Sequence, residues 1–194
     1  MIGFGLASAL ASSTISHLLL STPDIDVISH VQNKYNKKLI YHQRSPDLAR
    51  INQKLNRTII NALDYYCENY SRPDAILVLN IEAPFRSELY IDKMINMMHI
   101  YDVDSVTGAS LEDDIFYSHD GSGLKTIFPD NGLRLERNDL YRKIGGITLV
   151  KESFFSEKNK IIGGKIGHIN MDQKSAFTII SDFDWIIAEA ICNL

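Results

Sequence analysis

The fold of this chain is decided by the stretch Ala75-Ile76-Leu77-Val78-Leu79-Asn80-Ile81-Glu82-Ala83-Pro84-Phe85-Arg86. Its first five residues form a continuous apolar run, which Arg72-Pro73-Asp74 precedes and Glu82-Ala83-Pro84 follows. A run of this length between turn residues predicts a strand that is buried on both faces of a parallel sheet. Ligands of open α/β sheets bind beyond the carboxyl ends of the strands, so we expect residues 80–86 to form a loop near a binding site.

Helix-like and strand-like segments alternate along the rest of the chain. We expect helices around Leu6, Leu10 and Ile15 and over residues 24–35, 55–70, 89–101 and 183–192, and strands over 17–21, 38–41, 75–79, 105–108, 146–150 and 175–180. The charged residues 112–138 are irregular, with hairpin-like turns at Asp120-Gly121 and Asn131-Gly132. This alternation predicts a single domain over residues 1–194, folded as a three-layer α/β/α sandwich with a mostly parallel sheet.

Composition excludes several classes of protein. The 194 residues carry a formal net charge of −4, and their basic residues are scattered, which argues against nucleic-acid binding. Cys67 and Cys192 lie far apart without zinc-ligand spacing, so we expect neither a metal site nor a disulfide framework there, and a reducing cytoplasm fits. Residues 1–11 resemble the core of a signal peptide but lack its basic leading region, and no apolar run is long enough to cross a bilayer.

Five segments of the chain match one enzyme family in order and spacing. They are Leu19-Leu20-Ser21-Thr22-Pro23-Asp24, Arg44-Ser45-Pro46-Asp47-Leu48-Ala49, Leu77-Val78-Leu79-Asn80-Ile81-Glu82-Ala83-Pro84-Phe85-Arg86, Arg142-Lys143-Ile144-Gly145-Gly146 and Ile180-Ser181-Asp182-Phe183-Asp184-Trp185-Ile186-Ile187-Ala188-Glu189. With these segments the chain resembles the acylneuraminate (CMP-sialic acid synthetase type) cytidylyltransferases. The resemblance implies a nucleotide-diphospho-sugar transferase-like fold. The implied reaction joins CMP from CTP to a nine-carbon 2-keto sugar acid of the sialic, legionaminic or pseudaminic type and releases pyrophosphate. The resemblance also implies Mg²⁺ as a cofactor and a dimer formed through the variable residues 111–141.

The resemblance places five residues at the nucleotide and sugar sites: Arg44, Asn80, Arg86, Arg134 and Gly145. The guanidinium of Arg44 would clamp an anion, although an exposed arginine that opens a turn is the common alternative. Asn80 stands where the family has a glutamine, and Arg86 has the alternative role of capping a neighbouring element in a proline-stabilised turn. Arg134 has the alternative of a solvated surface charge. Gly145 keeps the tight backbone entry into a strand, and the resemblance identifies no catalytic residue in this chain.

The chain departs from the family where the triphosphate and its metal ion are held. Nucleotidyl transfer uses Mg²⁺ to neutralise the triphosphate, and the family provides an Asp-x-Asp pair for this ion. The positions in register here are Thr178 and Ile180, neither of which carries a carboxylate. Asp182 and Asp184 are the nearest candidate metal ligands, but aspartates at the start of a helix commonly cap it. The chain also aligns only after the family's first strand and its basic, glycine-containing phosphate loop.

Two hypotheses follow from these departures. In the first, the protein is a cytidylyltransferase that binds CTP and a sugar acid, but is impaired because the phosphate loop and the metal pair are absent. In the second, it is a catalytically inactive relative that serves as a binding or assembly partner of an active paralogue, or pairs with itself. The second draws support from altered positions throughout the site, namely Ile51, Asn80, Ile144, Thr178 and Ile180. Loss of the first strand predicts an unpaired sheet edge and a marginal monomer that gains stability by dimerisation.

Overall fold

The structure is a computed structural model that describes residues 1–35, 39–50, 52–112, 114–127 and 139–193. Its helices are α1 (Ile2–Ala11), α2 (Ile25–Tyr35), the 3-10 helix η1 (Pro46–Ala49), α3 (Leu55–Cys67), α4 (Glu88–Tyr101), α5 (Glu152–Lys158), α6 (Gln173–Ala176) and α7 (Asp182–Cys192). Its strands are β1 (Leu18–Thr22), β2 (Leu39–Gln43), β3 (Ala75–Leu79), β4 (Ser105–Glu112), β5 (Tyr117–His119), β6 (Leu124–Thr126), β7 (Leu140–Lys151) and β8 (Ile166–Asn170). Within these residues, no helix is long and apolar enough to span a bilayer.

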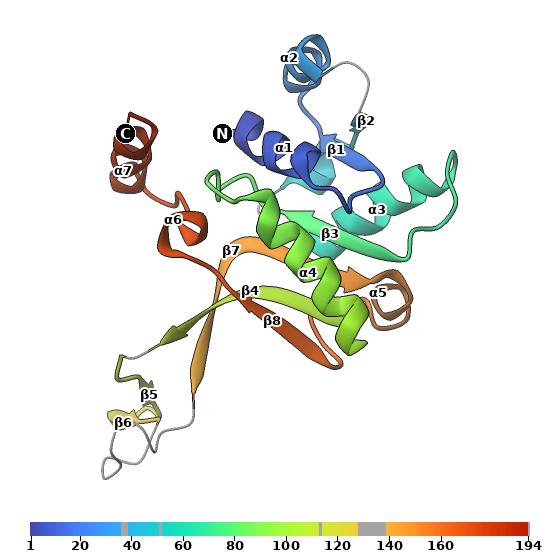
Figure 1. Cartoon of the computed structure of the whole chain (residues 1–194). Helices are drawn as coiled ribbons and strands as arrows, with labels where there is room; N and C mark the ends of the chain where they lie inside the picture. The colour runs from blue at the N-terminus through green and yellow to red at the C-terminus, as the bar shows by residue number, and fades with distance from the viewer. Residues whose placement is uncertain (36–38, 51, 113, 128–138, 194) are drawn as a thin grey trace.

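The strands form three separate sheets (Figure 1). β1 and β2 pair in parallel, β5 and β6 form an antiparallel hairpin, and the other four strands pair in the order β3-β7-β4-β8. Within the four-stranded sheet β3, β4 and β8 run in one direction, while β7 runs against both of its neighbours. The predicted mostly parallel α/β architecture is therefore confirmed, with β7 as its antiparallel strand.

Helices cover both faces of the four-stranded sheet. The larger core cluster includes Ile91, Met94 and Met98 of α4, Val106 of β4, and Ile147 and Leu149 of β7. The second cluster consists of Ile59 and Leu63 of α3, Val150 of β7 and Phe155 of α5. Leu149 and Val150 belong to different clusters because successive side chains of a strand point to opposite faces. The arrangement is the predicted sandwich of helices, sheet and helices.

Strand β3 lies at an edge of its sheet, not in the centre. It pairs with β7 from Ala75 opposite Lys151 to Leu79 opposite Ile147, and no other strand of the described residues pairs with it. All five of its side chains are only half-buried, and those of β1 are likewise half-buried. The predicted packing on both faces is found, because Ala75, Leu77 and Leu79 pack against the larger core cluster and Ile76 and Val78 against the second. Full burial of the strand is wrong, since all five side chains are only half-buried.

The prediction of a strand over residues 175–180 is also wrong. Asp172 caps the short helix α6 there, since its Oδ1 accepts a 2.9 Å hydrogen bond from the backbone N–H of Ser175. The strand at this end of the chain is β8, in which the buried Gly167 and Ile169 alternate with exposed residues. A strand with one buried face contains few apolar residues, so a search for apolar runs overlooks it.

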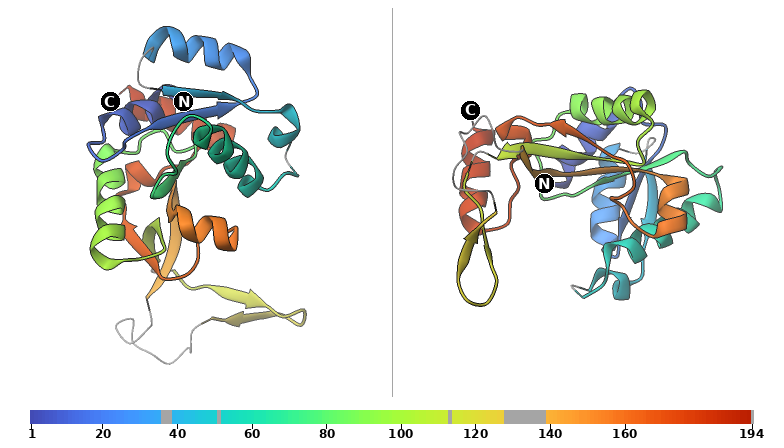
Figure 2. Two further views of the ribbon diagram at one scale, coloured as in Figure 1. Left: turned by 90° about the vertical axis from the view of Figure 1, so that its right-hand side faces the viewer. Right: turned by 90° about the horizontal axis from the view of Figure 1, so that it is seen from below.

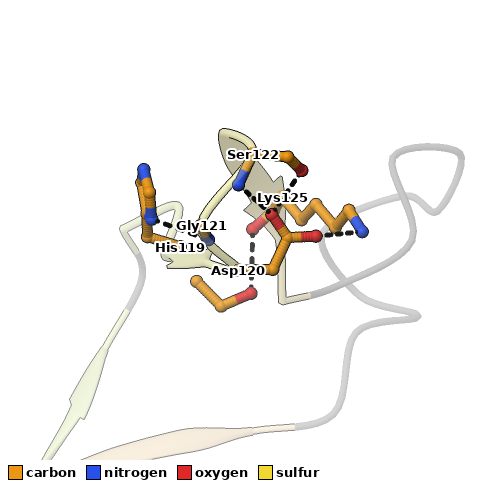
Figure 3. A network of polar contacts seen from close by, with 6 residues as sticks. His119, Asp120, Gly121, Ser122 and Lys125 are labelled. Atoms are coloured by element: carbon orange, nitrogen blue, oxygen red, sulfur yellow. Dashed lines mark hydrogen bonds and ion pairs between the residues drawn. The ribbon is translucent and has the colours of Figure 1, made fainter.

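The β5–β6 hairpin flanks the predicted Asp120-Gly121 turn and projects away from the four-stranded sheet (Figures 1 and 2). Figure 3 shows how Asp120 holds the turn, because its carboxylate pairs with Lys125 and accepts hydrogen bonds from the N–H and hydroxyl of Ser122 at 3.0 and 2.7 Å. The hydrogen bond from Lys125 is the main cause that lowers the pKa of Asp120 to about 2. The Asn131-Gly132 turn lies outside the described residues.

Candidate functional site

Three of the segments singled out from the sequence meet at the C-terminal end of β3. The backbone N–H of Asn80 donates to the carbonyl of Gly146 at 2.8 Å, which ties the 80–86 loop to β7. The N–H of Ile179 donates to the carbonyl of Glu82, also at 2.8 Å, which ties the linker between α6 and α7 to the same loop. We call this meeting of the 80–86 loop, Gly145-Gly146 and Ile179 the junction. Its position fits the expectation that the loop after β3 belongs to a binding edge.

Arg86 is the buried centre of the junction. Only 3% of its surface is exposed, and its guanidinium donates to the carbonyls of Asn80, Ala83 and Gly146 at 2.8, 3.0 and 3.3 Å. Burial lowers the pKa of Arg86 to about 10, so it stays protonated at neutral pH. These contacts are the ones that the turn-stabilising alternative predicts. A direct role of Arg86 in binding substrate stays a prediction.

Gly145 and Gly146 are required by backbone geometry. Their φ angles of +74° and +52° lie in the left-handed region that side chains disfavour. A Cβ on Gly145 would lie 2.6 Å from Sδ of Met171, and one on Gly146 would lie 3.0 Å from Cβ of Asn80. Gly146 therefore allows β7 to approach the 80–86 loop closely, and Gly145 makes room for the side chain of Met171. Whether Gly145 also contacts nucleotide stays a prediction.

Arg44 follows the C-terminal end of β2. Its backbone N–H donates to the carbonyl of Thr22 at 3.1 Å, which fixes Arg44 beside the end of β1. Its Nε is buried and has no hydrogen-bond partner within the described part of the chain. A guanidinium whose Nε–H has no partner can donate that hydrogen bond to an anion. Among the described residues, no hydrogen bond or ion pair joins Arg44 to the junction.

His42 neighbours Arg44 and was not singled out from the sequence. It is 6% exposed, its Nδ1 lies 3.0 Å from Oγ of Ser21, and its ring stacks on Tyr65 of α3 with 4.6 Å between ring centroids. Burial, and then the charge of Arg44, lower its pKa, so the imidazole is neutral at pH 7. The signal that could have found it is a histidine at an inward position near the end of a strand.

Asp182 and Asp184 lie at the start of α7. Oδ2 of Asp184 accepts hydrogen bonds from the N–H groups of Ile180 and Ser181 at 3.0 and 2.9 Å, and from the Ser181 hydroxyl at 2.8 Å. These bonds, the one from Ile180 first, lower the pKa of Asp184. Ser181 in turn accepts from the N–H of Asp184, which completes a capping box.

The hydrogen bonds of Asp184 argue against the predicted metal site at Asp182 and Asp184. In the part of the chain that the structure describes, no three His, Cys, Asp or Glu side chains gather as metal ligands. Because Asp184 is engaged in the cap, the pair Asp182 and Asp184 does not fit a magnesium site as it stands. A dependence on Mg²⁺ stays a prediction, as do the two metal ligands. Arg134 lies outside the described residues.

Comparison with known proteins supports the fold. No protein-family model matches the chain. The post-translational flagellin modification protein B of Campylobacter coli is 22% identical over 198 residues, which cover 97% of this chain and 82% of that protein.

Solved cytidylyltransferase structures align with almost the whole chain. The 4-diphosphocytidyl-2C-methyl-D-erythritol synthase of Anaerococcus prevotii has a TM-score of 0.71 at 17% identity, covering 98% of this chain and 85% of that structure. CMP:2-keto-3-deoxy-manno-octonic acid synthetase complexed with CTP has a TM-score of 0.63 at 10% identity, covering 100% and 88%. At these identities the likeness shows the fold alone. The chain therefore has the nucleotide-diphospho-sugar transferase-like fold of these cytidylyltransferases.

Proposed function

We propose that this protein binds CTP and that its reaction is the transfer of CMP to a nine-carbon 2-keto sugar acid with release of pyrophosphate. The observation that carries the proposal is the junction, which lies at the C-terminal end of a strand in a fold shared with cytidylyltransferases. Loops at this edge are where α/β sheets bind ligands. The sugar-acid substrate and the nucleotide-sugar pathway come from the resemblance of the sequence, and a cytoplasmic location is part of the same proposal.

The proposed nucleotide contacts are Arg44, Asn80 and Gly145. Arg44 contributes a cation whose Nε has no hydrogen-bond partner among the described residues, and Asn80 a side-chain amide at the end of β3. Gly145 lets the backbone pass without a side chain in the way. In the reaction the anomeric hydroxyl of the sugar acid attacks the α-phosphate of CTP. These residues would therefore act by positioning the two substrates and by offsetting the negative charge of the phosphates. Arg134 and Arg86 complete the proposed set of binding residues, and no residue is assigned as catalytic.

One observation favours a second candidate function, that of a catalytically silent relative. Asp184 is committed to the helix cap, and Thr178 and Ile180 provide no carboxylate in its place. A protein of this kind keeps the fold and a binding surface without turnover. Its partner is a second copy of itself or an active paralogue.

Calorimetric titration of the full chain with CTP, with and without Mg²⁺, tests the first proposal. We expect binding, and an Arg44→Gln variant should weaken it about tenfold because a charge-assisted contact is lost. Arg50→Gln is the matched control, since Arg50 is an exposed arginine paired with Asp47 in the same segment. No binding of CTP under either condition overturns the proposal. Binding without turnover of a sialic, legionaminic or pseudaminic acid supports the silent relative.

We also propose that the protein forms a dimer through residues 111–141. Residue 113 and residues 128–138 of this segment lie outside the described residues. The described part exposes the apolar side chains Leu111, Ile115, Tyr117, Leu124, Ile127 and Tyr141. Clustered exposed apolar residues are typical of interaction surfaces.

Light scattering coupled to size-exclusion chromatography tests the dimer. We expect a dimer for the natural sequence and a shift toward monomer for Leu124→Lys. The control is Ile100→Lys on α4, because Ile100 and Leu124 are equally exposed, at 69% and 68%. A natural protein that stays monomeric across micromolar concentrations contradicts the proposal.

A further inference from the structure

Beside the junction lies a cluster of aromatic rings and one ammonium group that the proposed nucleotide contacts do not use. We propose that Phe4, Phe85 and Lys174 form a subsite for an anionic sugar, with the sugar ring packed on Phe4 and the sugar carboxylate bound by Lys174. This inference rests on the proposed function, because it assigns residues to the acceptor of the CMP group.

The cluster is centred on the ring of Phe85 in the 80–86 loop. Phe4 of α1 meets this ring edge to face, with centroids 6.0 Å apart and planes at 68°. The ring centroid of Phe177, which follows α6, lies 6.2 Å from that of Phe85, and Nζ of Lys174 lies 5.9 Å from the Phe85 centroid. Two segments that are distant in sequence, α1 and the region of α6, therefore converge on a ring of the 80–86 loop.

The loop that carries Phe85 is held in place by contacts already described. Arg86, the next residue, bonds to three carbonyls of the junction, and Ile179 ties the segment after Phe177 to Glu82. The capped start of α6 fixes the helix that carries Lys174. A subsite on rigid supports loses little conformational entropy when a ligand binds.

Phe4 leaves apolar surface free for a ligand. Its side chain is 49% exposed, although Leu6 and Ala9 of the same helix are buried against the protein. Covering an exposed aromatic face is favourable in proportion to the apolar area removed from water. The C–H face of a sugar ring is a surface of suitable size and polarity for this contact.

Lys174 provides a charge for the carboxylate. It forms no ion pair with any residue that the structure describes, and Asp172, the nearest carboxylate in sequence, is engaged by Tyr90 and by the cap of α6. An exposed cation over an aromatic ring is held only weakly, so the ammonium is free to bind a carboxylate, which is a stronger partner.

Calorimetric titration of the full chain with N-acetylneuraminic acid and with its uncharged methyl ester tests the subsite. We expect Phe4→Ser and Lys174→Gln each to weaken binding of the acid about fivefold or more, and the methyl ester to bind as weakly as the acid binds to Lys174→Gln. The affinity for CTP should not change. Circular dichroism and thermal unfolding confirm that each variant is folded.

Two matched controls separate the subsite from general surface effects. Phe183→Ser on α7 removes a phenylalanine that is 69% exposed, and Lys34→Gln on α2 removes an ammonium 5.5 Å from the ring of Tyr35. Neither control should change binding of the acid.

The outcomes distinguish the subsite from the proposed function. If the acid fails to bind, or binds equally well to both subsite variants, the subsite is overturned whatever CTP does. If the variants weaken CTP instead of the acid, the cluster is a nucleotide contact and the assignment to the sugar is overturned. If CTP fails to bind but the acid binds and depends on Phe4 and Lys174, the nucleotide proposal fails and the subsite stands.

Discussion

Helices α4 and α7 have similar apolar content but very different surroundings. α4 buries Ile91, Met94 and Met98 against the four-stranded sheet, whereas α7 buries only Ala188. Phe183 and Ile186 of α7 are exposed, and the helix stands apart from the sheet (Figures 1 and 2). The difference teaches that apolar content makes a helix suitable for burial, but contact with a sheet decides whether it is buried.

The first prediction tests this comparison by truncating one residue in each helix. Met94→Ala should lower the free energy of unfolding by about 2–5 kcal/mol, because Met94 is fully buried and its loss leaves a cavity. Ile186→Ala should change it by less than about 0.5 kcal/mol, because Ile186 is 63% exposed. Urea unfolding followed by circular dichroism measures both values. A large loss for Ile186→Ala would mean that α7 is packed in solution, for example by a second copy.

The second prediction concerns the junction, where polar contacts take the place of apolar packing. Arg86→Met should lower the free energy of unfolding by about 2–3 kcal/mol, because the carbonyls of Asn80, Ala83 and Gly146 would lose a charged donor. Arg50→Met is the control, since Arg50 is exposed and its pair with Asp47 contributes little. Equal unfolding curves for Arg86→Met and the natural protein would show that Arg86 is not needed for the junction.

The third prediction concerns the local signal that starts α7. Ser181→Ala should cost about 1 kcal/mol of helix stability, because it removes the hydroxyl that accepts from the N–H of Asp184. Since α7 has little tertiary packing, the loss should appear as faster amide hydrogen exchange in α7 and not as global unfolding. Ser16→Ala, at an exposed serine outside any helix, is the control. Unchanged exchange in α7 would contradict the role of the cap.

The fourth and smallest expected effect is a pH dependence of the free energy of unfolding, which arises from His42 of β2 where it packs against α3. Burial lowers the pKa of His42 in the folded protein, so the unfolded chain binds the proton first as the pH falls below about 6.5. Stability is therefore lost between the unfolded pKa and the lower folded pKa, and the contribution of His42 is constant above that window. His42→Gln should flatten this slope, relative to the natural protein, in urea unfolding measured from pH 7.5 to 5. An unchanged slope in His42→Gln would assign the pH dependence to other groups.

The sequence located the elements of the fold better than their environments. The apolar run at 75–79 correctly predicts a strand, and the helices around residues 24–35, 89–101 and 183–192 are found close to their predicted bounds. β8 was missed because only Gly167 and Ile169 face the core. Periodicity identifies an element by its own residues, but it carries little signal when half of a strand is polar.

The parts of the candidate site that depend on local sequence were predicted, and the contacts between distant residues were not. Asn80 was placed at a strand end because the run before it reads as a strand, and the Gly145-Gly146 pair was expected at a tight backbone entry. The burial of Arg86 depends on Gly146, which is 60 residues away in sequence. The lowered pKa of His42 comes from its burial, where its ring stacks on Tyr65, and then from the charge of Arg44. Local patterns do not encode these contacts.

By itself, the sequence determined the α/β alternation, the loop after β3 and the capping box of α7, because each depends on residues close together in the chain. Only the tertiary structure decided that β3 is an edge strand, that Arg86 is buried and that α7 is left exposed. The physical reason is that strand pairing and removal from water depend on partners distant in sequence. The same strand could lie in the centre or at the edge of a sheet, and the same side chain could be buried or exposed, depending on which distant segments pack against it.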